Sequence, residues 1–182
     1  SSKEVLERVA EKLKEVNERL KDVLRRVAEK LKRANEENKK VLERVRDILR
    51  EVLRRLREKV TDKDKIRELE TRIKKLLDDL ERSSKDDSRR SKDLLRKLEE
   101  LVRDLSKRSK ELLKELEDLV RRGDGSVEEA ERVVEKSVEE ARRLAERVKE
   151  EVDRSVKHSE DNVREMRRLV EEIVKRVEEA AK

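Results

Sequence analysis

The side chains most able to perform chemistry are Asp87 and the only histidine, His158. If the chain folds back on itself as antiparallel helices, both residues reach the same level, where a carboxylate and an imidazole form an acid–base pair. Ser84 or Ser159 would then supply a hydroxyl nucleophile. Such a site also requires a pocket for a substrate, and we expect a long, tightly packed coiled coil to offer no cleft. We therefore predict no catalytic residues and no enzymatic activity.

The composition excludes several other kinds of site. The 182 residues include no cysteine, no proline, no aromatic residue, one histidine and two glycines. Disulfides, thiolate nucleophiles, cysteine or multi-histidine metal sites, aromatic stacking platforms and glycine-rich phosphate loops are therefore ruled out. We predict no cofactor, no metal and no small-molecule ligand.

Hydropathy gives no sign of a membrane partner. No apolar run approaches the ~18 residues of a membrane span. The first residues, SSKEVLERVA, contain no signal-peptide core. We expect a soluble protein with no natural compartment, located in the cytoplasm of a recombinant host.

The charge balance raises the possibility of a nucleic-acid partner. The chain carries 54 basic and 48 acidic residues, for a net charge of +6. Weak, salt-dependent contact with phosphates is plausible for such a surface, but specific recognition lacks a docking motif and a basic face free of acids. We predict no specific nucleic-acid partner. The basic clusters are Arg25, Arg26, Lys30, Lys32 and Arg33, and Arg54, Arg55, Arg57 and Lys59.

Two breaks divide the chain into three predicted helices. The first is KVTDKDK, where Thr61 or Asp62 can cap a new helix, and the second is RRGDGSVEEA, where Gly123 and Gly125 precede a cap at Ser126. Ser1 or Ser2 would cap the first helix. The predicted helices span roughly 2–60, 63–122 and 126–181, and each is ~87 Å long.

Aliphatic residues recur at steps of three and four, which is the pattern of a coiled-coil seam. In the first helix we expect one register slip, from Val27 to Leu31. Short connections make successive helices antiparallel. We predict an all-α fold, an up-down-up antiparallel three-helix bundle that forms a single domain over residues 1–182. The representative seam positions are Leu6, Val9, Leu13, Val16, Leu20, Val23 and Val27, then Ile66, Leu69, Ile73, Leu76 and Leu80, and then Val152, Val156, Val163, Met166, Val170, Ile173 and Val177.

Most of the uncharged polar residues also fall on the seam. Because the rise per residue is equal, antiparallel pairing brings them from all three helices to two levels. We interpret them as two buried hydrogen-bond layers that fix which helix faces pair and in what register. The smaller layer consists of Asn17, Ser106, Ser109 and Ser137. The larger consists of Asn35, Asn38, Ser84, Asp87, Ser88, Ser91, Ser155, His158, Ser159 and Asn162.

Helix charge supports the same pairing. Residues 1–60 carry a net charge of +7, residues 61–122 a net +3 and residues 123–182 a net −4. A basic first helix beside an acidic third helix favours the intended arrangement over wrong ones.

Taken together, the LERVAEKLKEV and LKELEDLVRR patterns, the VTDKDK and GDGS connectors and the Ser/Asn/His layers resemble de novo designed helical bundles with buried hydrogen-bond networks. The resemblance covers the whole chain. It implies either a structural scaffold or a module that associates with itself or with a designed partner helix. Monomer, homo-oligomer and hetero-oligomer remain alternatives.

Overall fold

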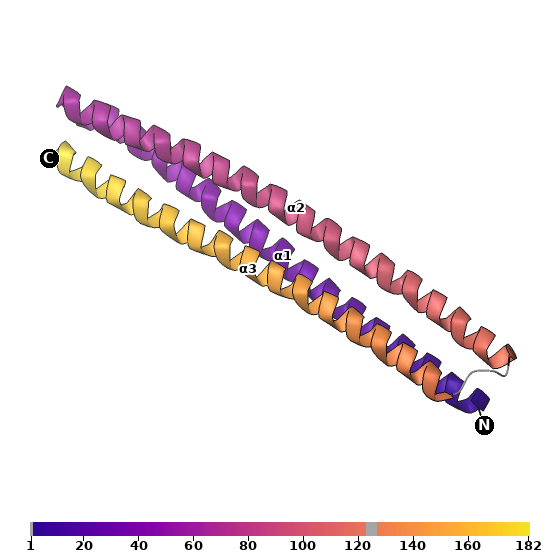
Figure 1. Cartoon of the computed structure of the whole chain (residues 1–182). Coiled ribbons are helices and arrows are strands. Elements are labelled where there is room, and N and C mark those ends of the chain that lie inside the picture. The colour runs from indigo at the N-terminus through magenta and orange to yellow at the C-terminus, as the bar shows by residue number, and fades with distance from the viewer. Residues whose placement is uncertain (1, 123–126) are drawn as a thin grey trace. The chain divides into compact units, whose positions relative to one another are not determined.

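Three long α-helices account for almost the whole chain. The computed structural model describes residues 2–122 and 127–182, in which α1 spans Ser2–Lys59, α2 Lys63–Arg122 and α3 Val127–Ala181 (Figure 1). The helices pack against one another and the described residues contain no strand, which confirms the predicted all-α three-helix bundle. The bounds agree with the predicted ranges to within one residue because the strong helix breakers, proline and glycine, are missing from all three helices.

Asp62 is the N-cap residue of α2. Its Oδ1 atom accepts hydrogen bonds from the backbone nitrogens of Asp64, at 3.0 Å, and Lys65, at 3.4 Å. A side-chain oxygen in this position satisfies amides that have no partner in the first helical turn. Of the two predicted caps, the structure therefore selects Asp62 and not Thr61. Several predicted caps and breaks lie outside the described residues, namely Ser1, Gly123, Gly125 and Ser126.

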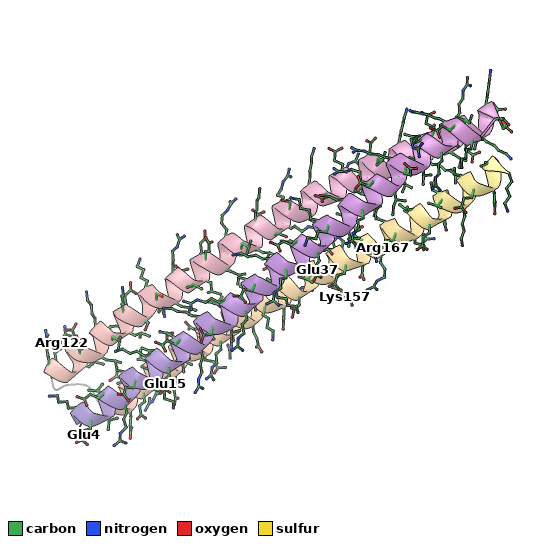
Figure 2. All side chains as sticks on the ribbon, turned by 180° about the vertical axis from the view of Figure 1, so that it is seen from behind. Glu4, Glu15, Glu37, Arg122, Lys157 and Arg167 are labelled. Carbon is green, nitrogen blue, oxygen red and sulfur yellow. The ribbon has the colours of Figure 1, made fainter. Side chains whose placement is uncertain are left out.

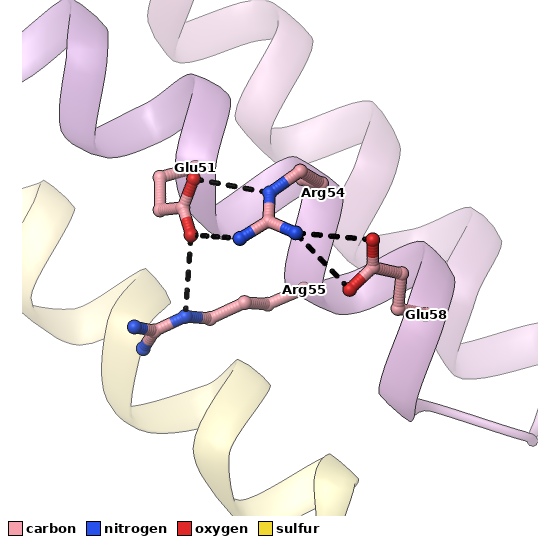
Figure 3. A network of polar contacts seen from close by, with 4 residues as sticks. All are labelled: Glu51, Arg54, Arg55 and Glu58. Atoms are coloured by element: carbon pink, nitrogen blue, oxygen red, sulfur yellow. Dashed lines mark hydrogen bonds and ion pairs between the residues drawn. The ribbon is translucent and has the colours of Figure 1, made fainter.

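The outer faces of the helices carry charged side chains that pair along the same helix. Figure 3 shows Arg54 between Glu51 and Glu58, with Arg55 also reaching Glu51 at 3.7 Å. The hydrogen bond to Arg54 lowers the pKa of the Glu51 carboxyl, and the same bond raises the pKa of Arg54. Such pairs, three and four residues apart, support an exposed helix modestly. Elsewhere, exposed charges such as Glu15, Glu37 and Lys157 project from the ribbons (Figure 2).

The chain gathers in two compact units, each built from one segment of every helix. Unit 1 comprises Ser1–Lys30 and Asp93–Asp153. One cluster of its core consists of Val9, Leu13, Leu112, Leu116, Ala130 and Val134.

Ion pairs between the helices of unit 1 show the direction in which neighbouring helices run. Lys97 pairs with Glu151 at 3.0 Å, and Arg108 pairs with Glu140 at 3.7 Å. Residue numbers rise on α2 as they fall on α3, so these two helices are antiparallel. Lys30 pairs with Asp153 at 3.0 Å and joins α1 to α3.

Unit 2 comprises Leu31–Lys92 and Arg154–Lys182. Leu49, Leu56 and Ile73 are completely buried within its apolar core. Arg57 on α1 pairs with Glu70 on α2 at 2.5 Å. The assignment of residues 1–182 to a single domain stays a prediction.

The seam of α1 differs from the predicted one at a single residue. Leu24 is 1% exposed, whereas Val23, the predicted seam residue, is 39% exposed. The buried residues therefore step by four from Val16 to Leu20 and by four again to Leu24, before the predicted slip from Val27 to Leu31. The prediction of one slip was wrong because Val23 and Leu24 are both aliphatic, and apolar character alone does not distinguish them.

The consequence is a change of repeat along two helices. In unit 1, equivalent buried positions recur every eleven residues, such as Leu13 and Leu24 on α1 and Val134 and Ala145 on α3. In unit 2, steps of three and four alternate strictly, as from Leu42 to Leu56 on α1 and from Val163 to Val177 on α3. An eleven-residue repeat favours a nearly straight or slightly right-handed path, and a seven-residue repeat a left-handed supercoil. The predicted heptad seam thus describes the unit 2 segments of these helices.

Candidate functional site

The larger polar layer lies in unit 2, where a buried serine links α2 to α1. Ser91 is 5% exposed, and its hydroxyl donates a hydrogen bond to Oδ1 of Asn35 at 2.7 Å. A buried amide needs such a partner, because an unpaired polar group in an apolar core is costly. Both residues were predicted members of the layer.

A second hydrogen bond links α2 to α3. The Asn162 amide nitrogen donates to the hydroxyl oxygen of Ser83 at 2.5 Å. Asn162 was predicted in the layer, but Ser83 was not, since Ser84 was chosen in its place. Ser84 instead lines a groove with Lys39 and Leu42 of α1. Adjacent residues of a helix point about 100° apart, so the two serines face different neighbours, and this spacing was the available signal.

Asp87 occupies the centre of the layer and is half-buried. Burial raises the pKa of its carboxyl above the ordinary value of 3.8, while a hydrogen bond with Ser159 and the charges of Arg90 and His158 oppose that shift. The neighbouring carboxylate of Asp86 adds to it. The layer therefore holds a carboxyl group whose charged form is disfavoured by its surroundings.

Two polar atoms of the layer lack a partner. Within the described residues, the buried Oδ2 atom of Asp87 and the buried Nδ2 atom of Asn38 make no hydrogen bond. One is an acceptor and the other a donor. The layer is thus only partly satisfied, which lowers its contribution to stability.

The remaining predicted members differ in burial. Ser159 is 6% exposed and Ser155 is half-buried, but Ser88 and His158 are exposed. Ser88 and His158 were placed in the layer by their height along the helix. Their side chains point to the flank, so height alone overestimated the layer.

The smaller layer lies in unit 1. Asn17, Ser109 and Ser137, one from each helix, are half-buried and line the same cavity of about 120 Å³, together with apolar residues such as Leu13. Ser106 is half-buried but does not line this cavity. The structure thus brings three of the four predicted residues around one space.

The possible acid–base pair lies in a surface groove between α2 and α3. The groove holds about 280 Å³, and Asp86, Asp87, Arg90, His158 and Asn162 are among its lining residues. This open surface groove differs from the expectation that the bundle offers no cleft.

The nucleophile candidates are poorly placed beside that pair. Ser159 is buried and hydrogen-bonded to Asp87. Ser84 lines the other groove, next to α1. The pair thus has a charged, open groove, and the two predicted hydroxyls do not face it.

Residues 2–122 and 127–182 lack two further kinds of site. No group of three or more histidine or acidic side chains there is arranged to hold a metal ion. None of the helices in that part of the chain combines the length and apolarity needed to cross a membrane.

The basic clusters of α1 are partly neutralised by neighbours. Arg54 and Arg55 contact Glu51, and Arg57 contacts Glu70 across the helix interface. Lys30, in the other cluster, pairs with Asp153. These contacts weaken the positive field that would attract phosphates.

Comparison with known protein families, with curated proteins and with solved structures found no match for this chain.

Proposed function

We propose that this protein has no natural biochemical activity and is a designed structural scaffold whose buried polar layers specify how its helices pair. The observation that carries the proposal is a pair of hydrogen bonds: Ser91 of α2 donates to Asn35 of α1, and Asn162 of α3 donates to Ser83 of α2. Both lie in unit 2, about two helical turns apart along α2, and both join side chains of limited exposure. No catalysis and no cofactor are part of the proposal.

A wrong register would remove one of these hydrogen bonds. Sliding α3 along α2 by one heptad sets Asn162 opposite Leu76 or Arg90 instead of Ser83. The amide then loses its hydroxyl partner inside the bundle, at about 1–3 kcal/mol. An aliphatic seam alone would lose little on the same slide, because one aliphatic residue replaces another. Polar layers of this kind are a known means of fixing register in coiled coils.

A designed origin is consistent with the sequence patterns described above. Three helices of this length, without proline and with a core built mainly of aliphatic residues, also fit the idealised elements that designers use.

A second candidate is an association module that accepts a helix from a copy of itself or from a partner through the same polar layers. The unpaired atoms of Asn38 and Asp87 favour it, because an incoming polar side chain could donate to one and accept from the other. Under this alternative the layer is completed only in the assembly.

The test replaces the paired residues by apolar ones in a single variant, Asn35→Leu, Ser91→Ala, Ser83→Ala and Asn162→Leu. We expect helicity to remain and amide signals to multiply, because several registers become nearly equal in energy. A matched control, Ser88→Ala with His158→Ala, changes exposed members of the same level and should behave as the wild type. A single set of amide signals and unchanged exchange protection in the four-residue variant would contradict the proposal.

Mass at low micromolar concentration separates the two candidates. A wild-type mass near 21.8 kDa favours the scaffold. A multiple of that mass that disappears in the four-residue variant favours the association module.

A further inference from the structure

A groove between α1 and α3 in unit 1 has an apolar floor and charged rims. It holds about 600 Å³, and its floor is formed by Val5, Val9, Val16, Val134 and Val138. In both views the α1 and α3 segments of unit 1 run side by side (Figures 1 and 2). Val23, 39% exposed, lies one heptad beyond Val16 and extends the apolar strip on α1.

The rims of this groove carry opposite charges. The α1 rim has Arg8 and Lys12, and the α3 rim has Glu131, Glu135 and Glu139, followed by Arg142. The rims are therefore basic on one side and mainly acidic on the other.

These rims are level with one another and yet do not pair. Lys30 and Asp153, 123 residues apart, form an ion pair between α1 and α3. The same separation sets Arg8 level with Glu131 and Lys12 level with Glu135. Within the described residues, however, no ion pair joins these side chains across the groove. Their charges remain available to a partner.

A like-charge pair lies beyond the opposite charges of the rims. The separation of 123 residues sets Arg19 level with Arg142, and both are exposed. Drawing the rims together would bring two guanidinium groups closer, which is unfavourable.

The partner that fits this charge pattern is a second copy of the chain. α1 and α3 run in the same direction, so a two-fold axis along the groove sets the α1 rim of one copy against the α3 rim of the other at the same level. Arg8 and Lys12 of each copy then meet the acidic rim of the other, as an isologous contact requires, whereas Arg19 meets Arg142. A two-fold axis across the groove would set α1 against α1 and oppose like charges.

We propose that the valine groove between α1 and α3 of unit 1 is a self-association surface that forms a parallel two-fold dimer. The floor is narrow and its valines are already largely buried, so the contact lies at the small end of protein interfaces. The dimer is accordingly weak, with a Kd above about 1 μM, and it weakens further as salt screens the rims. This surface is separate from the polar layers.

The test is sedimentation equilibrium of the whole protein from about 10 μM to 1 mM at low salt, a range set by that expected Kd. The mean mass should rise from 21.8 kDa toward twice that value. Two rim variants, Arg8→Glu with Lys12→Glu and Glu131→Lys with Glu135→Lys, should each weaken the dimer at least tenfold. All four side chains are exposed, so both variants should fold.

Mixing the two variants gives the sharper readout. One variant has two acidic rims and the other has two basic rims, so only the heterodimer is complementary, and an equimolar mixture should recover the mass that each variant loses alone. A control with the same charge change outside the groove, Lys14→Glu with Arg25→Glu, should dimerise as the wild type.

A wild-type mass that stays at 21.8 kDa up to 1 mM would overturn the proposal. So would a dimer that is insensitive to the rim variants. Either result leaves the polar layers untouched, because neither rim variant alters a residue of those layers.

Discussion

Asp87 is one of two residues that leave the polar layer incompletely satisfied. One carboxyl oxygen lacks a partner within the described chain, and burial raises the pKa of the group. The charged form at neutral pH is therefore held in an unfavourable place. At neutral pH this residue therefore lowers the stability of the fold.

Replacing Asp87 with asparagine should raise the free energy of unfolding at pH 7 by about 1 kcal/mol, since the neutral isostere removes the cost of the partly buried charge. A carboxyl whose pKa is raised by folding stabilises the folded state more as the pH falls. The advantage of Asp87→Asn should therefore shrink as the pH is lowered from 7 to about 3, through the folded-state pKa. Urea denaturation followed by circular dichroism measures this difference.

The comparison must be made between variant and wild type at each pH. Glu51, Glu70 and Glu165 have pKa values lowered mainly by hydrogen bonds to arginines, so they lose stability in acid and give the opposite slope. Asp93→Asn, on the exposed face of α2, is the matched control and should show no such trend. An advantage for Asp87→Asn that grows in acid would show that the carboxylate is stabilising.

The position of each polar residue along its helix was predictable from the sequence, whereas the direction in which its side chain points was not. Equal rise per residue placed Asn35 and Ser91 at one level, and the structure joins them. The same argument included Ser88, which is exposed, and missed Ser83, which is bonded. A difference of one residue rotates a side chain by about 100°, and the phase of each helix is set by packing against its neighbours.

At the scale of the elements, the repeat decides which aliphatic residues are buried. On α1 in unit 1, the buried residues are spaced by four from Val16 to Leu20 and by four again from Leu20 to Leu24. Leu24 therefore lies in the core, and Val23 lies at the edge of the buried face. The polar residues of α1 and α3 in unit 2, including Asn35 and Ser159, precede the stretch where the strict alternation of three and four begins. Polar side chains that pair through hydrogen bonds do not need the knobs-into-holes packing of aliphatic side chains, so they tolerate such a change of repeat.

Leu24 and Val23 test this register directly. Leu24→Ala should lower the free energy of unfolding by about 2–5 kcal/mol, because it leaves a cavity at a position that is 1% exposed. Val23→Ala should cost less than about 1 kcal/mol, as substitutions at exposed positions do. Chemical denaturation of both variants gives the comparison. Equal costs, or a larger cost for Val23→Ala, would favour the heptad seam with Val23 inside.

At the scale of the whole molecule, net charge governs contact with other polyelectrolytes. The chain carries +6, but several of its basic side chains are already paired with acidic ones on the same or the neighbouring helix. Binding to nucleic acid should therefore be electrostatic and without sequence preference.

Fluorescence anisotropy with duplexes of unrelated sequence checks this expectation. Affinities should agree within about threefold between sequences, and binding should fall by at least tenfold between about 50 and 200 mM salt. A strong preference for one duplex, or binding that persists at high salt, would indicate a recognition surface and contradict the proposed scaffold role.

By itself, the sequence determined the class of the fold, the number of helices and their bounds. These properties follow from local causes, namely aliphatic periodicity, the lack of proline, glycine confined to one connector, and a capping aspartate at Asp62. It also determined the levels of the polar residues, because rise per residue is constant along a helix.

Only the tertiary structure decided which neighbour each polar side chain faces, which of two adjacent aliphatic residues is buried, and where grooves remain. Ser83 rather than Ser84 bonds Asn162, and Leu24 rather than Val23 enters the core. The physical reason is that helix phase is a collective result of packing three helices together. A single sequence with aliphatic or polar residues at adjacent positions is compatible with more than one phase.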